Sequence, residues 1–549
     1  LADEDSLMGG RLNGETHLVG DLPGAEWAAS VVADLAAMPN VRLMSNTTIT
    51  GAYDQGTYGA LERLPCSLGT RPADLPVECF WRIVAKRVVL AAGALERGIA
   101  FAANDRPGIM TAGAVRTYVN RWGVAPGQNV VVFGNNDDAH RTAHDLIAAG
   151  VEVTALVDSR PDAQAAGHFP VYAGATICDS SGRHGLRSVQ VQHSDGSTNR
   201  LETDCLAVSG GWNPTVHITC HMNGRPKWRV DIASFVPVPK AIPGLTAAGA
   251  CNGSFSTYRC LQDGHAAATE ALGALKIKAK KTAVPKSEDA AYAIAPLWAV
   301  PGKGRAWVDL QNDVTVKDIA QAASESFTSV EHMKRYTTQG MAPDQGKNSN
   351  VQALAVLADV TGRGIPETGV TTFRPPFSPV AIAAMGAGAQ GMGFAPRRLM
   401  TSHKASLERG APMIEVGLWY RPRYFPIPGE ATWRQSCDRE VGYVRNVVGV
   451  CDVSTLGKID IQGPDAAAFL DFVYINVFST LKPGRVRYGV MLREDGAVMD
   501  DGTTACLGPR HYVMTTSTGA AGDVMRHLEF VHQCLCPQMD VQIMSVTEN

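Results

Sequence analysis

Two adjacent carboxylates, Asp500 and Asp501, close a strand–turn–strand segment and could do acid–base chemistry. The segment runs from Arg485 to Thr504, and its turn is expected at Glu494-Asp495-Gly496. A carboxylate held near a reacting nitrogen can position an amine and move protons. Asp500 is the first choice for that role, whereas Asp501 is about as well explained as a solvent-exposed residue at a strand end. Tyr488, on the neighbouring strand, is placed to touch a ligand bound there.

An acidic residue near the other end of the sequence, Asp3, indicates nucleotide binding. It follows an apolar pair and precedes Gly9-Gly10, as at the end of the second strand of a Rossmann unit. An acid in this position accepts hydrogen bonds from a ribose hydroxyl. A 2′-phosphate about 4 Å away would be repelled by about 4 kcal/mol at an effective dielectric of about 20. The site is therefore predicted to prefer NAD, or the ADP half of FAD, over NADP; alternatively, Asp3 only caps the following turn.

Two turns of small residues complete the predicted dinucleotide site. Ala92 and Gly93 follow one predicted strand, and Gly249 and Ala250 follow another that leads into a helix. Small residues let a dinucleotide approach the backbone, although they also follow strands for packing alone. Flavoproteins of the glutathione-reductase type carry an Asp where Ala250 stands, so NAD fits this turn better than FAD. The helix N-terminus would offer about half a positive charge to a pyrophosphate.

A second Rossmann-like unit is expected from Asn129 onward. A predicted strand over Asn129–Phe133 leads to the turn Gly134-Asn135-Asn136-Asp137-Asp138-Ala139. The turn follows the GxGxxG pattern with Asn136 and Ala139 in the second and third glycine places. Ala139 still allows close packing of helix on sheet, but Asn136 carries a Cβ where the backbone should approach a pyrophosphate. We therefore expect this unit to be a scaffold without bound phosphate.

The region from about 285 to 355 is expected to be mostly helical and resembles a small ferredoxin-like module. In some oxidoreductases that module holds an iron–sulfur cluster through four cysteines. The matching positions here are Asp309, Gln311, Asp344 and Ser349. Oxygen and amide groups do not replace thiolates around such a cluster, so no cluster and no metal site are predicted. Three further residues are expected to form a solvated charged face, with contact to a nucleotide as the alternative: Arg335, Tyr336 and Lys347.

Length and composition indicate a multidomain globular protein. The 549 residues correspond to about three or four domains of roughly 150 residues each. A net charge of −3 provides no basic field for nucleic acid or an anionic membrane, and no transmembrane span is predicted. The 12 cysteines form no CxxC pair, as in a reduced cytosolic protein. The chain begins without Met and ends in a strand-like run, so we expect an internal fragment of a longer polypeptide.

Several motifs occur in the order found in the alpha subunits of heterotetrameric sarcosine oxidases, and the chain resembles that family over most of its length. The segments that carry the resemblance are Ala94-Leu95-Glu96-Arg97, Asn104-Asp105-Arg106-Pro107-Gly108, Phe133-Gly134-Asn135-Asn136-Asp137-Asp138, residues 329–338, Arg374-Pro375-Pro376 and the Asp500 block. From Val444 onward the sequence also resembles the folate-binding domain of the aminomethyltransferases, which include the glycine-cleavage T-protein.

The resemblance implies how the work is divided between this chain and its partners. FAD and covalent FMN would belong mainly to a beta subunit, where O2 would oxidise sarcosine. The imine would then meet tetrahydrofolate on this chain, giving glycine, methylenetetrahydrofolate and hydrogen peroxide. Gamma and delta subunits would complete a cytoplasmic complex. The site residues implied are Asp3, Gly9, Gly10, Ala92, Gly93, Gly249 and Ala250 for NAD, and Tyr488, Asp501 and the catalytic Asp500 for folate.

The expected fold class combines three kinds of module. An α/β module of two dinucleotide-binding domains, glutathione-reductase-like and of Rossmann type, precedes a small helical ferredoxin-like insert without cluster and a truncated α+β aminomethyltransferase-like folate domain. The expected boundaries are 1–95 with 216–280 for the first, N-terminally truncated dinucleotide (NAD) domain, 96–215 for the second, 281–355 for the helical module and 356–549 for the folate domain.

Two other functions are compatible with the residues alone. The first is a self-contained NAD- or FAD-dependent dehydrogenase of a methylated glycine, which would need its own flavin; Ala250 argues against one. The second is a cofactor-binding scaffold without turnover. The lone histidines on predicted helices, His140, His144 and His265, lack metal-ligand spacing and are expected to pack or face solvent.

Overall fold

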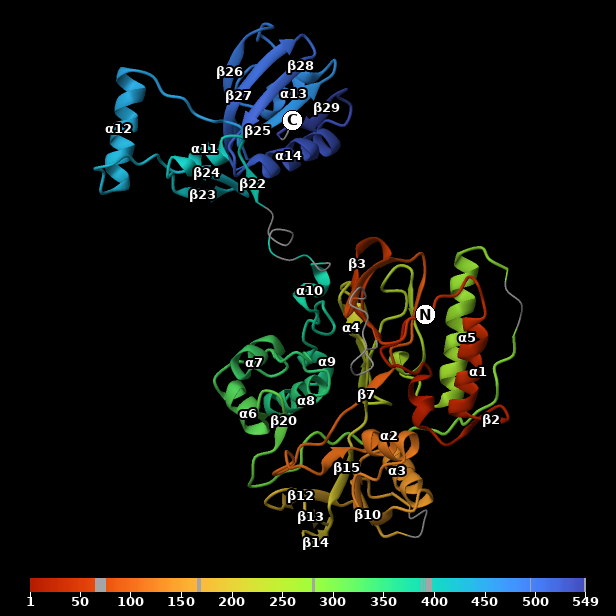
Figure 1. Cartoon of the computed structure of the whole chain (residues 1–549). Helices are drawn as coiled ribbons and strands as arrows, with labels where there is room; N and C mark the ends of the chain where they lie inside the picture. The colour runs from red at the N-terminus through yellow and green to blue at the C-terminus, as the bar shows by residue number, and fades with distance from the viewer. Residues whose placement is uncertain are drawn as a thin grey trace. The chain divides into compact units, whose positions relative to one another are not determined.

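The computed structural model divides into two compact units, each described here by itself (Figure 1). Unit 1 comprises Leu1–Gly388 and unit 2 comprises Ala389–Asn549. The structure describes residues 1–547 except 65–75, 165–168, 279–281, 387–388, 390, 392–396 and 494. One residue of the predicted 494–496 turn, Glu494, therefore lies outside the described residues. The boundary expected at residue 356 stays a prediction.

The first part of unit 1 joins strands from distant parts of the sequence. The strand β6 (Val88–Leu90) pairs in parallel with β19 (Leu245–Ala247). Helices α1 (Gly24–Ala36) and α5 (Thr257–Ala274) belong to the same part. Parallel neighbours need a crossover connection rather than a hairpin. Here the crossover from β6 to β19 contains the second Rossmann-like unit.

A three-stranded antiparallel sheet is part of the same region of unit 1. It consists of β3 (Thr47–Tyr53), β4 (Thr57–Arg63) and β5 (Glu78–Val84). The turn between β3 and β4 lies at Asp54–Gly56. Gly56 has a φ of +70°, and a Cβ there would come within 2.5 Å of the Ala85 carbonyl oxygen, so the turn requires glycine.

The second Rossmann-like unit is built on a fully parallel sheet in the order β11-β10-β9-β15-β8. The buried apolar run Val130–Phe133 occupies its centre, as expected for a strand covered on both faces. Helices α2 (Ala112–Trp122) and α3 (Asp137–Ala148) pack on the sheet. The strands are β8 (Ile109–Thr111), β9 (Asn129–Gly134), β10 (Glu152–Asp158), β11 (Val171–Ala173) and β15 (Cys205–Ser209), with an antiparallel meander of β12 (Thr176–Ser181), β13 (Ser188–Gln192) and β14 (Thr198–Glu202).

A helical module follows in unit 1, and Figure 1 shows α6, α7 and α8 gathered together. The helix α8 (Asn350–Thr361) is buried along most of its length, from Ala353 to Ala358. The other two are α6 (Val316–Ser324), which begins with a capping box at Thr315 and Asp318, and α7 (Val330–Thr337). A helix that is apolar on all sides must be covered by neighbours, so α8 forms the centre of the module.

Unit 2 contains a five-stranded antiparallel sheet in the order β26-β27-β28-β25-β29. Helix α13 (Ala466–Val473) and helix α14 (Ala521–Phe530) contribute Phe469, Leu470 and Leu528 to its core. The strands are β25 (Gly457–Gln462), β26 (Val486–Leu492), β27 (Val498–Gly508), β28 (His511–Thr516) and β29 (Gln542–Ser545). A smaller sheet and two helices precede it: β22 (Arg398–Leu399), β23 (Met413–Val416), β24 (Trp419–Pro422), α11 (His403–Glu408) and α12 (Trp433–Asn446).

Short elements connect these parts. They are η1 (Gly10–Gly14), β1 (Leu18–Val19), β2 (Leu22–Pro23), β7 (Ala94–Glu96), β16 (Trp212–Pro214), α4 (His217–Cys220), β17 (Lys227–Arg229), β18 (Ser234–Val236), η3 (Gly249–Asn252), β20 (Trp307–Asp309), β21 (Val314–Thr315), α9 (Ile365–Thr368), α10 (Ile382–Met385) and η5 (Val531–Leu535). Within the described ranges, no helix combines the length and apolarity that crossing a bilayer requires.

A guanidinium group without exposure to solvent, that of Arg97, links several parts of unit 1. Its Nε donates to the Gly210 carbonyl oxygen at 2.8 Å, and its Nη1 donates to Asn213 Oδ1 at 2.8 Å and to Ser234 Oγ at 2.9 Å. The Trp298 ring lies 4.7 Å from the guanidinium carbon. Burial lowers the pKa of Arg97 to about 10, so the group is still charged at neutral pH. These oxygen acceptors and the ring compensate for part of the lost hydration, while Nη2 has no hydrogen-bond partner among the described residues.

Replacing Arg97 by Met should destabilise unit 1. The substitution keeps much of the side-chain volume but leaves Gly210 O and Asn213 Oδ1 without their donor. We expect a loss of about 2–5 kcal/mol in the free energy of unfolding, measured by urea denaturation with tryptophan fluorescence. Arg183→Met, at an exposed position, is the matched control and should change stability by less than about 0.5 kcal/mol. Equal midpoints for both variants would contradict the role given to Arg97.

Candidate functional site

The acid proposed for ribose binding, Asp3, lies at the end of an extended segment. Its amide donates to Met44 O at 2.9 Å, and its own carbonyl oxygen accepts from Thr47 N at 2.7 Å. Its Oδ1 accepts from Asp5 N at 3.0 Å, which fixes the direction of the carboxylate in an Asx turn. Capping of the following turn and ribose binding are therefore compatible roles for the same half-buried side chain.

The glycines after Asp3 are constrained by close neighbours. Gly9 has a φ of +137°, and a Cβ there would lie 2.9 Å from Asn13 Oδ1. Gly10 has a φ of +55° and opens η1. Both backbone conformations favour glycine, so local geometry alone accounts for the pair.

The structure brings the two small-residue turns together. The strands β6 and β19 are parallel neighbours, so the residues that follow each of them, Ala92-Gly93 and Gly249-Ala250, lie at one edge of the sheet. Gly93 and Gly249 have φ values of +69° and +68°. Asp3 forms hydrogen bonds with Met44, Thr47 and Asp5, which belong to neither of these turns.

An acid that the sequence analysis missed, Asp263, lies beside the second turn. It comes from α5, and its Oδ2 accepts from Gly249 N at 3.3 Å and from Ser254 Oγ at 2.8 Å. At the N-terminus of α5, Ser256 caps the helix and donates to Asp289 Oδ1 at 2.6 Å. Two carboxylates near this terminus reduce its attraction for a pyrophosphate. No periodicity in the sequence identifies a side chain that reaches back in this way.

The N-terminus of α3 in the second Rossmann-like unit is filled by the chain itself. The side chain of Asn136 caps the helix through Asp138 N at 3.0 Å and donates to Ser209 O at 2.9 Å. Ile294 forms an antiparallel bridge with Asn136, and Ala295 N donates to Asn135 O at 3.0 Å. Residues 293–295 therefore lie across the turn where a pyrophosphate would bind. This arrangement supports the expectation of a scaffold.

A buried carboxyl, Glu96, lies near this turn at the end of β7. Its Oε2 accepts from Gly113 N at 2.5 Å and its Oε1 accepts from Ser209 Oγ at 2.8 Å. Burial raises its pKa to about 7, and the neighbouring Asp138 adds to the shift. Asp138 also accepts from Trp212 Nε1 at 2.5 Å and from Arg11 Nη2 at 3.1 Å. Glu96 and Asp138 are buried, whereas Arg11 is partly exposed to solvent.

Glu96→Gln should change how stability depends on pH. The pKa of Glu96 in the folded chain, about 7, exceeds the ordinary value of 4.5, so between these values the folded state binds more protons than the unfolded state. The free energy of unfolding should therefore fall as pH rises from 4.5 to 7, by about 3 kcal/mol from this group. Gln does not titrate, so the variant should lose that decline.

The measurement is urea denaturation at several pH values between 5 and 8. Glu26→Gln, at an exposed position on α1, serves as the control and should keep the wild-type slope. An unchanged slope in Glu96→Gln would show that Glu96 is ionised throughout.

The candidate catalytic residue in unit 2, Asp500, lies on the buried face of the sheet. It lies opposite Met491 on β26 and is 7% exposed. Its Oδ1 accepts from Ser517 Oγ at 2.7 Å and its Oδ2 accepts from Ser517 N at 3.0 Å. A carboxylate has about four acceptor positions, so about two remain for a ligand. Ser517, which follows β28 and donates both of these hydrogen bonds, was not identified from the sequence.

The neighbouring acid, Asp501, faces the opposite side of the sheet. Successive strand residues point to opposite faces, and Asp501 is exposed where Asp500 is buried. Tyr488, also exposed, donates its hydroxyl proton to Asp501 Oδ2, and this contact raises the Tyr488 pKa. The structure therefore brings Tyr488 and Asp501 together but places Asp500 on the other face.

Further polar side chains surround the segment after Ser517. Thr518 contacts Thr455, with 3.1 Å between the hydroxyl oxygens, and accepts from Arg421 Nη1 at 3.4 Å. Arg421 belongs to the aromatic and proline-rich strand β24, so the smaller sheet contributes to the surroundings of Asp500. Thr518, Thr455 and Arg421 therefore place hydrogen-bond donors and acceptors next to Ser517.

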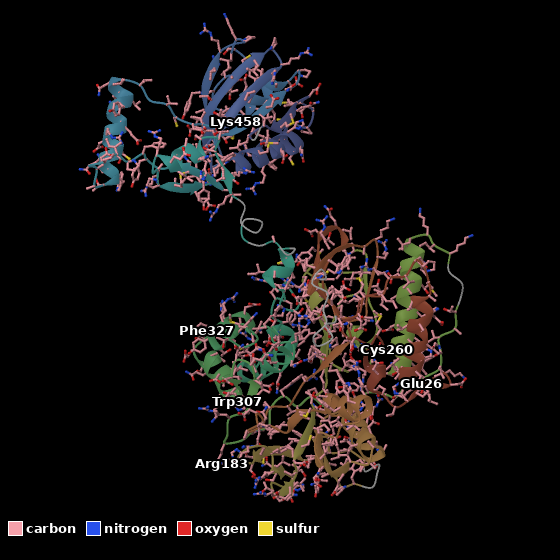
Figure 2. All side chains as sticks on the ribbon, in the orientation of Figure 1. Glu26, Arg183, Cys260, Trp307, Phe327 and Lys458 are labelled. Carbon is pink, nitrogen blue, oxygen red and sulfur yellow. The ribbon has the colours of Figure 1, made fainter. Side chains whose placement is uncertain are left out.

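A further acid in unit 2, Asp452, forms hydrogen bonds to the loop before β25. It accepts from Ser402 Oγ at 2.6 Å and from Ser454 N at 2.9 Å, and the Ser402 contact is the main cause of a pKa lowered to about 2. Lys458, labelled in Figure 2, donates to Ser454 O at 2.8 Å and to Leu456 O at 2.9 Å. These contacts hold the loop, and sequence reasoning missed them.

The positions matched to cluster ligands in the helical module make other contacts. Asp309 Oδ2 accepts from Gly340 N at 2.7 Å and Asp309 Oδ1 accepts from Gln311 N at 2.9 Å. Gln339 Nε2 donates to Ser349 Oγ and to Asn350 Oδ1, both at 2.9 Å. In the part of the chain that the structure describes, no group of three or more His, Cys, Asp and Glu residues is arranged to hold a metal ion.

Together these features define a two-dinucleotide-binding-domain oxidoreductase fold in unit 1 and an aminomethyltransferase-type domain in unit 2. The GCVT N-terminal domain family matches residues 402–549, and the sarcosine oxidase A3 domain family matches residues 303–389. The crystal structure of L-proline dehydrogenase from P. horikoshii covers 70% of this chain and 74% of its own, with a TM-score of 0.55 and 18% identity, which indicates a shared fold.

Curated relatives match this chain from end to end. The sarcosine oxidase subunit alpha of Rhizobium meliloti (strain 1021) is 44% identical over 100% of the chain, and that of Corynebacterium sp. (strain P-1) is 40% identical over the same share. The chain spans 56% and 59% of the lengths of these relatives. The resemblance to the alpha subunits of sarcosine oxidase is thereby confirmed along the whole chain.

Proposed function

We propose that this chain is part of the alpha subunit of a heterotetrameric sarcosine oxidase. The observation that carries the proposal is the identity of 40–44% to sarcosine oxidase alpha subunits through both structural units. In the proposed reaction O2 accepts two electrons from sarcosine and becomes hydrogen peroxide. Tetrahydrofolate then takes the one-carbon unit from the resulting imine, and glycine and methylenetetrahydrofolate are released. Beta, gamma and delta subunits are the proposed partners, in the cytoplasm, with FAD and FMN mainly on the beta subunit.

In this proposal unit 1 binds NAD rather than FAD at its first dinucleotide-binding domain. Asp3 ends an extended segment, and Asp5 N orients its carboxylate; in dinucleotide-binding folds an acid in this position hydrogen-bonds a ribose hydroxyl. The turns at Gly93 and Gly249 leave out side chains where a dinucleotide would approach. Ala250 provides a methyl group where a ribitol would need a carboxylate. The second Rossmann-like unit has no part in binding, because residues 293–295 cover its turn.

Asp3→Asn should reduce discrimination between NAD and NADP. Loss of the negative charge removes repulsion of a 2′-phosphate, so the ratio of the two dissociation constants should fall by at least about tenfold. Isothermal titration calorimetry with both nucleotides on the intact alpha subunit gives the ratio. The control is Glu4→Gln, at the adjacent exposed acid. Wild-type protein that binds NADP as tightly as NAD would contradict the assignment.

The folate step is proposed to depend on Asp500. Its buried carboxylate is held by Ser517, so it can accept a proton from a folate nitrogen and stabilise the cation that forms there. Asp501 and Tyr488 are proposed as folate contacts on the outer face of the sheet. Because the two acids lie on opposite faces, one folate molecule would reach both only around the edge of the sheet.

Asp500→Asn should separate the two products of the assembled oxidase. We expect the rate of methylenetetrahydrofolate formation to fall by about 10²–10⁴-fold, the usual contribution of an acid–base residue, while peroxide release remains near the wild-type rate. Asp501→Asn is the matched control on the opposite face and should have a smaller effect. Equal losses of folate product and peroxide in Asp500→Asn would refute the role.

A self-contained dehydrogenase and a scaffold without turnover are less well supported. The relatives matched over the full chain are oxidase alpha subunits, and Ala250 does not suit a flavin on this chain. Stoichiometric flavin on the intact alpha subunit expressed alone would favour the dehydrogenase instead.

A further inference from the structure

A basic pocket lies in unit 1 between the end of α7 and the segment 372–375. Its volume of about 300 Å³ is within the range of small-molecule sites. We call it the basic pocket; the lining residues that matter here are Glu331, Lys334, Arg335, Gln345, Phe373 and Arg374. The dinucleotide site and the Asp500 region involve none of these residues.

The pocket carries an excess of positive charge. Three cations, Lys334, Arg335 and Arg374, face one carboxylate, Glu331, which leaves two positive charges in excess. Glu331 lies 3.3 Å from Arg335 and accepts from Thr372 N at 2.7 Å. Among the residues that the structure describes, neither Lys334 nor Arg374 forms an ion pair. Two cations are therefore available to a ligand.

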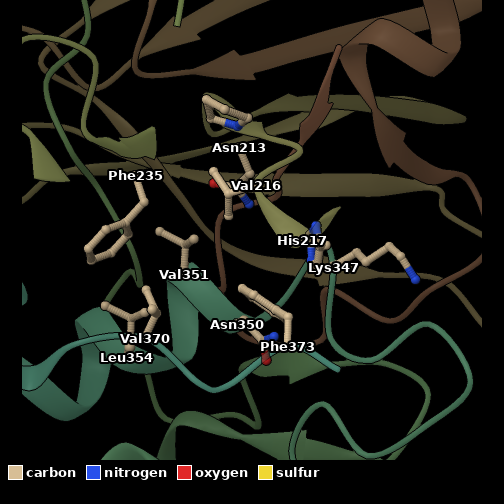
Figure 3. A pocket seen from close by; sticks show the side chains of 11 residues that line it. Asn213, Val216, His217, Phe235, Lys347, Asn350, Val351, Leu354, Val370 and Phe373 are labelled. Carbon is tan, nitrogen blue, oxygen red and sulfur yellow. The ribbon is translucent and has the colours of Figure 1, made fainter. Parts of the chain in front are cut away.

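The wall that carries Arg374 is held in place before any ligand binds. Glu331 fixes Thr372, and Gln345 Nε2 donates to Pro376 O at 2.5 Å. Phe373 is buried against His217, with 4.0 Å between the ring centroids. Behind Phe373 lies a cavity of about 20 Å³, shown in Figure 3, which has room for about one water molecule. The pocket is thus largely preformed, which reduces the entropy lost on binding.

Arg335, Tyr336 and Lys347, which were expected to form a solvated charged face, make different contacts in the structure. Tyr336 stacks on Phe327, with 4.6 Å between the ring centroids, and donates to Glu325 Oε2. Lys347 donates to Asp344 O at 2.9 Å and to Phe377 O at 2.5 Å. Of that group, only Arg335 lines the basic pocket.

We propose that the basic pocket binds the phosphate group of a small ligand. A phosphate dianion balances the two excess positive charges, and guanidinium groups bind its oxygens through paired N–H donors. Lys334 adds a point charge from α7, while Arg374 approaches from the facing segment. A phosphomonoester of a nucleotide and inorganic phosphate share this chemistry. The site is independent of the NAD and folate assignments, so its failure would leave them unchanged.

The test is calorimetric titration of the intact alpha subunit, saturated with NAD so that the proposed dinucleotide site is occupied, with inorganic phosphate, with adenosine 5′-monophosphate and with adenosine. Binding of either phosphate-bearing probe at least about tenfold tighter than adenosine is expected. Tighter binding of the nucleotide would identify a nucleotide ligand, and equal binding would identify free phosphate. Failure of both phosphate-bearing probes to bind would overturn the proposal.

Two variants localise the binding. Lys334→Gln with Arg374→Gln should weaken the phosphate-bearing probe by at least about tenfold and make its binding less sensitive to salt. Lys317→Gln, at an exposed position on α6 of the same module, should bind as the wild type does. Both changes are near the surface, and circular dichroism would verify folding. Undiminished affinity in the double variant, or an equal loss in the control, would place the phosphate elsewhere and overturn the proposal.

Discussion

Unit 1 depends on a buried charge, that of Arg97, which forms no ion pair with a carboxylate among the residues that the structure describes. The guanidinium of Arg97 donates through Nε and Nη1 to Gly210 O, Asn213 Oδ1 and Ser234 Oγ and packs against Trp298. A cation transferred from water to an apolar interior loses several kcal/mol unless such groups are already in place. The strands that carry the acceptors and the segment that carries Trp298 must therefore adopt one arrangement. That arrangement fixes β7 against β16, close to Glu96 and to the turn of the second Rossmann-like unit.

Local features of the fold were predictable from the sequence, whereas long-range contacts were not. The largely apolar run at Asn129–Phe133 predicted a strand, and β9 (Asn129–Gly134) confirms it. The bridge between Asn136 and Ile294 joins residues far apart in the chain. A lone apolar residue in an extended segment gives no signal of its partner. That residues 293–295 cover the N-terminus of α3 could therefore be recognised only from the structure.

The candidate sites show the same difference. The Asp500–Asp501 pair was recognised from its residue types, but adjacency in sequence suggested a joint site. Strand geometry puts neighbouring residues on opposite faces, and the structure accordingly separates Asp500 with Ser517 from Asp501 with Tyr488. The period of two was available in the sequence. The contributions of Ser517 and Asp263 were not, because each depends on which side chain reaches across a turn.

The loops of the helical module are joined by side chains of the chain itself, chiefly Asp309, Gln339 and Asn350. Such ties form as the polypeptide folds and need no inorganic centre to be delivered by other proteins. They join nitrogen and oxygen atoms, which are not oxidised under conditions that oxidise sulfur ligands. A protein whose proposed partners consume oxygen and release peroxide would thereby retain the shape of this module in the presence of its own by-product.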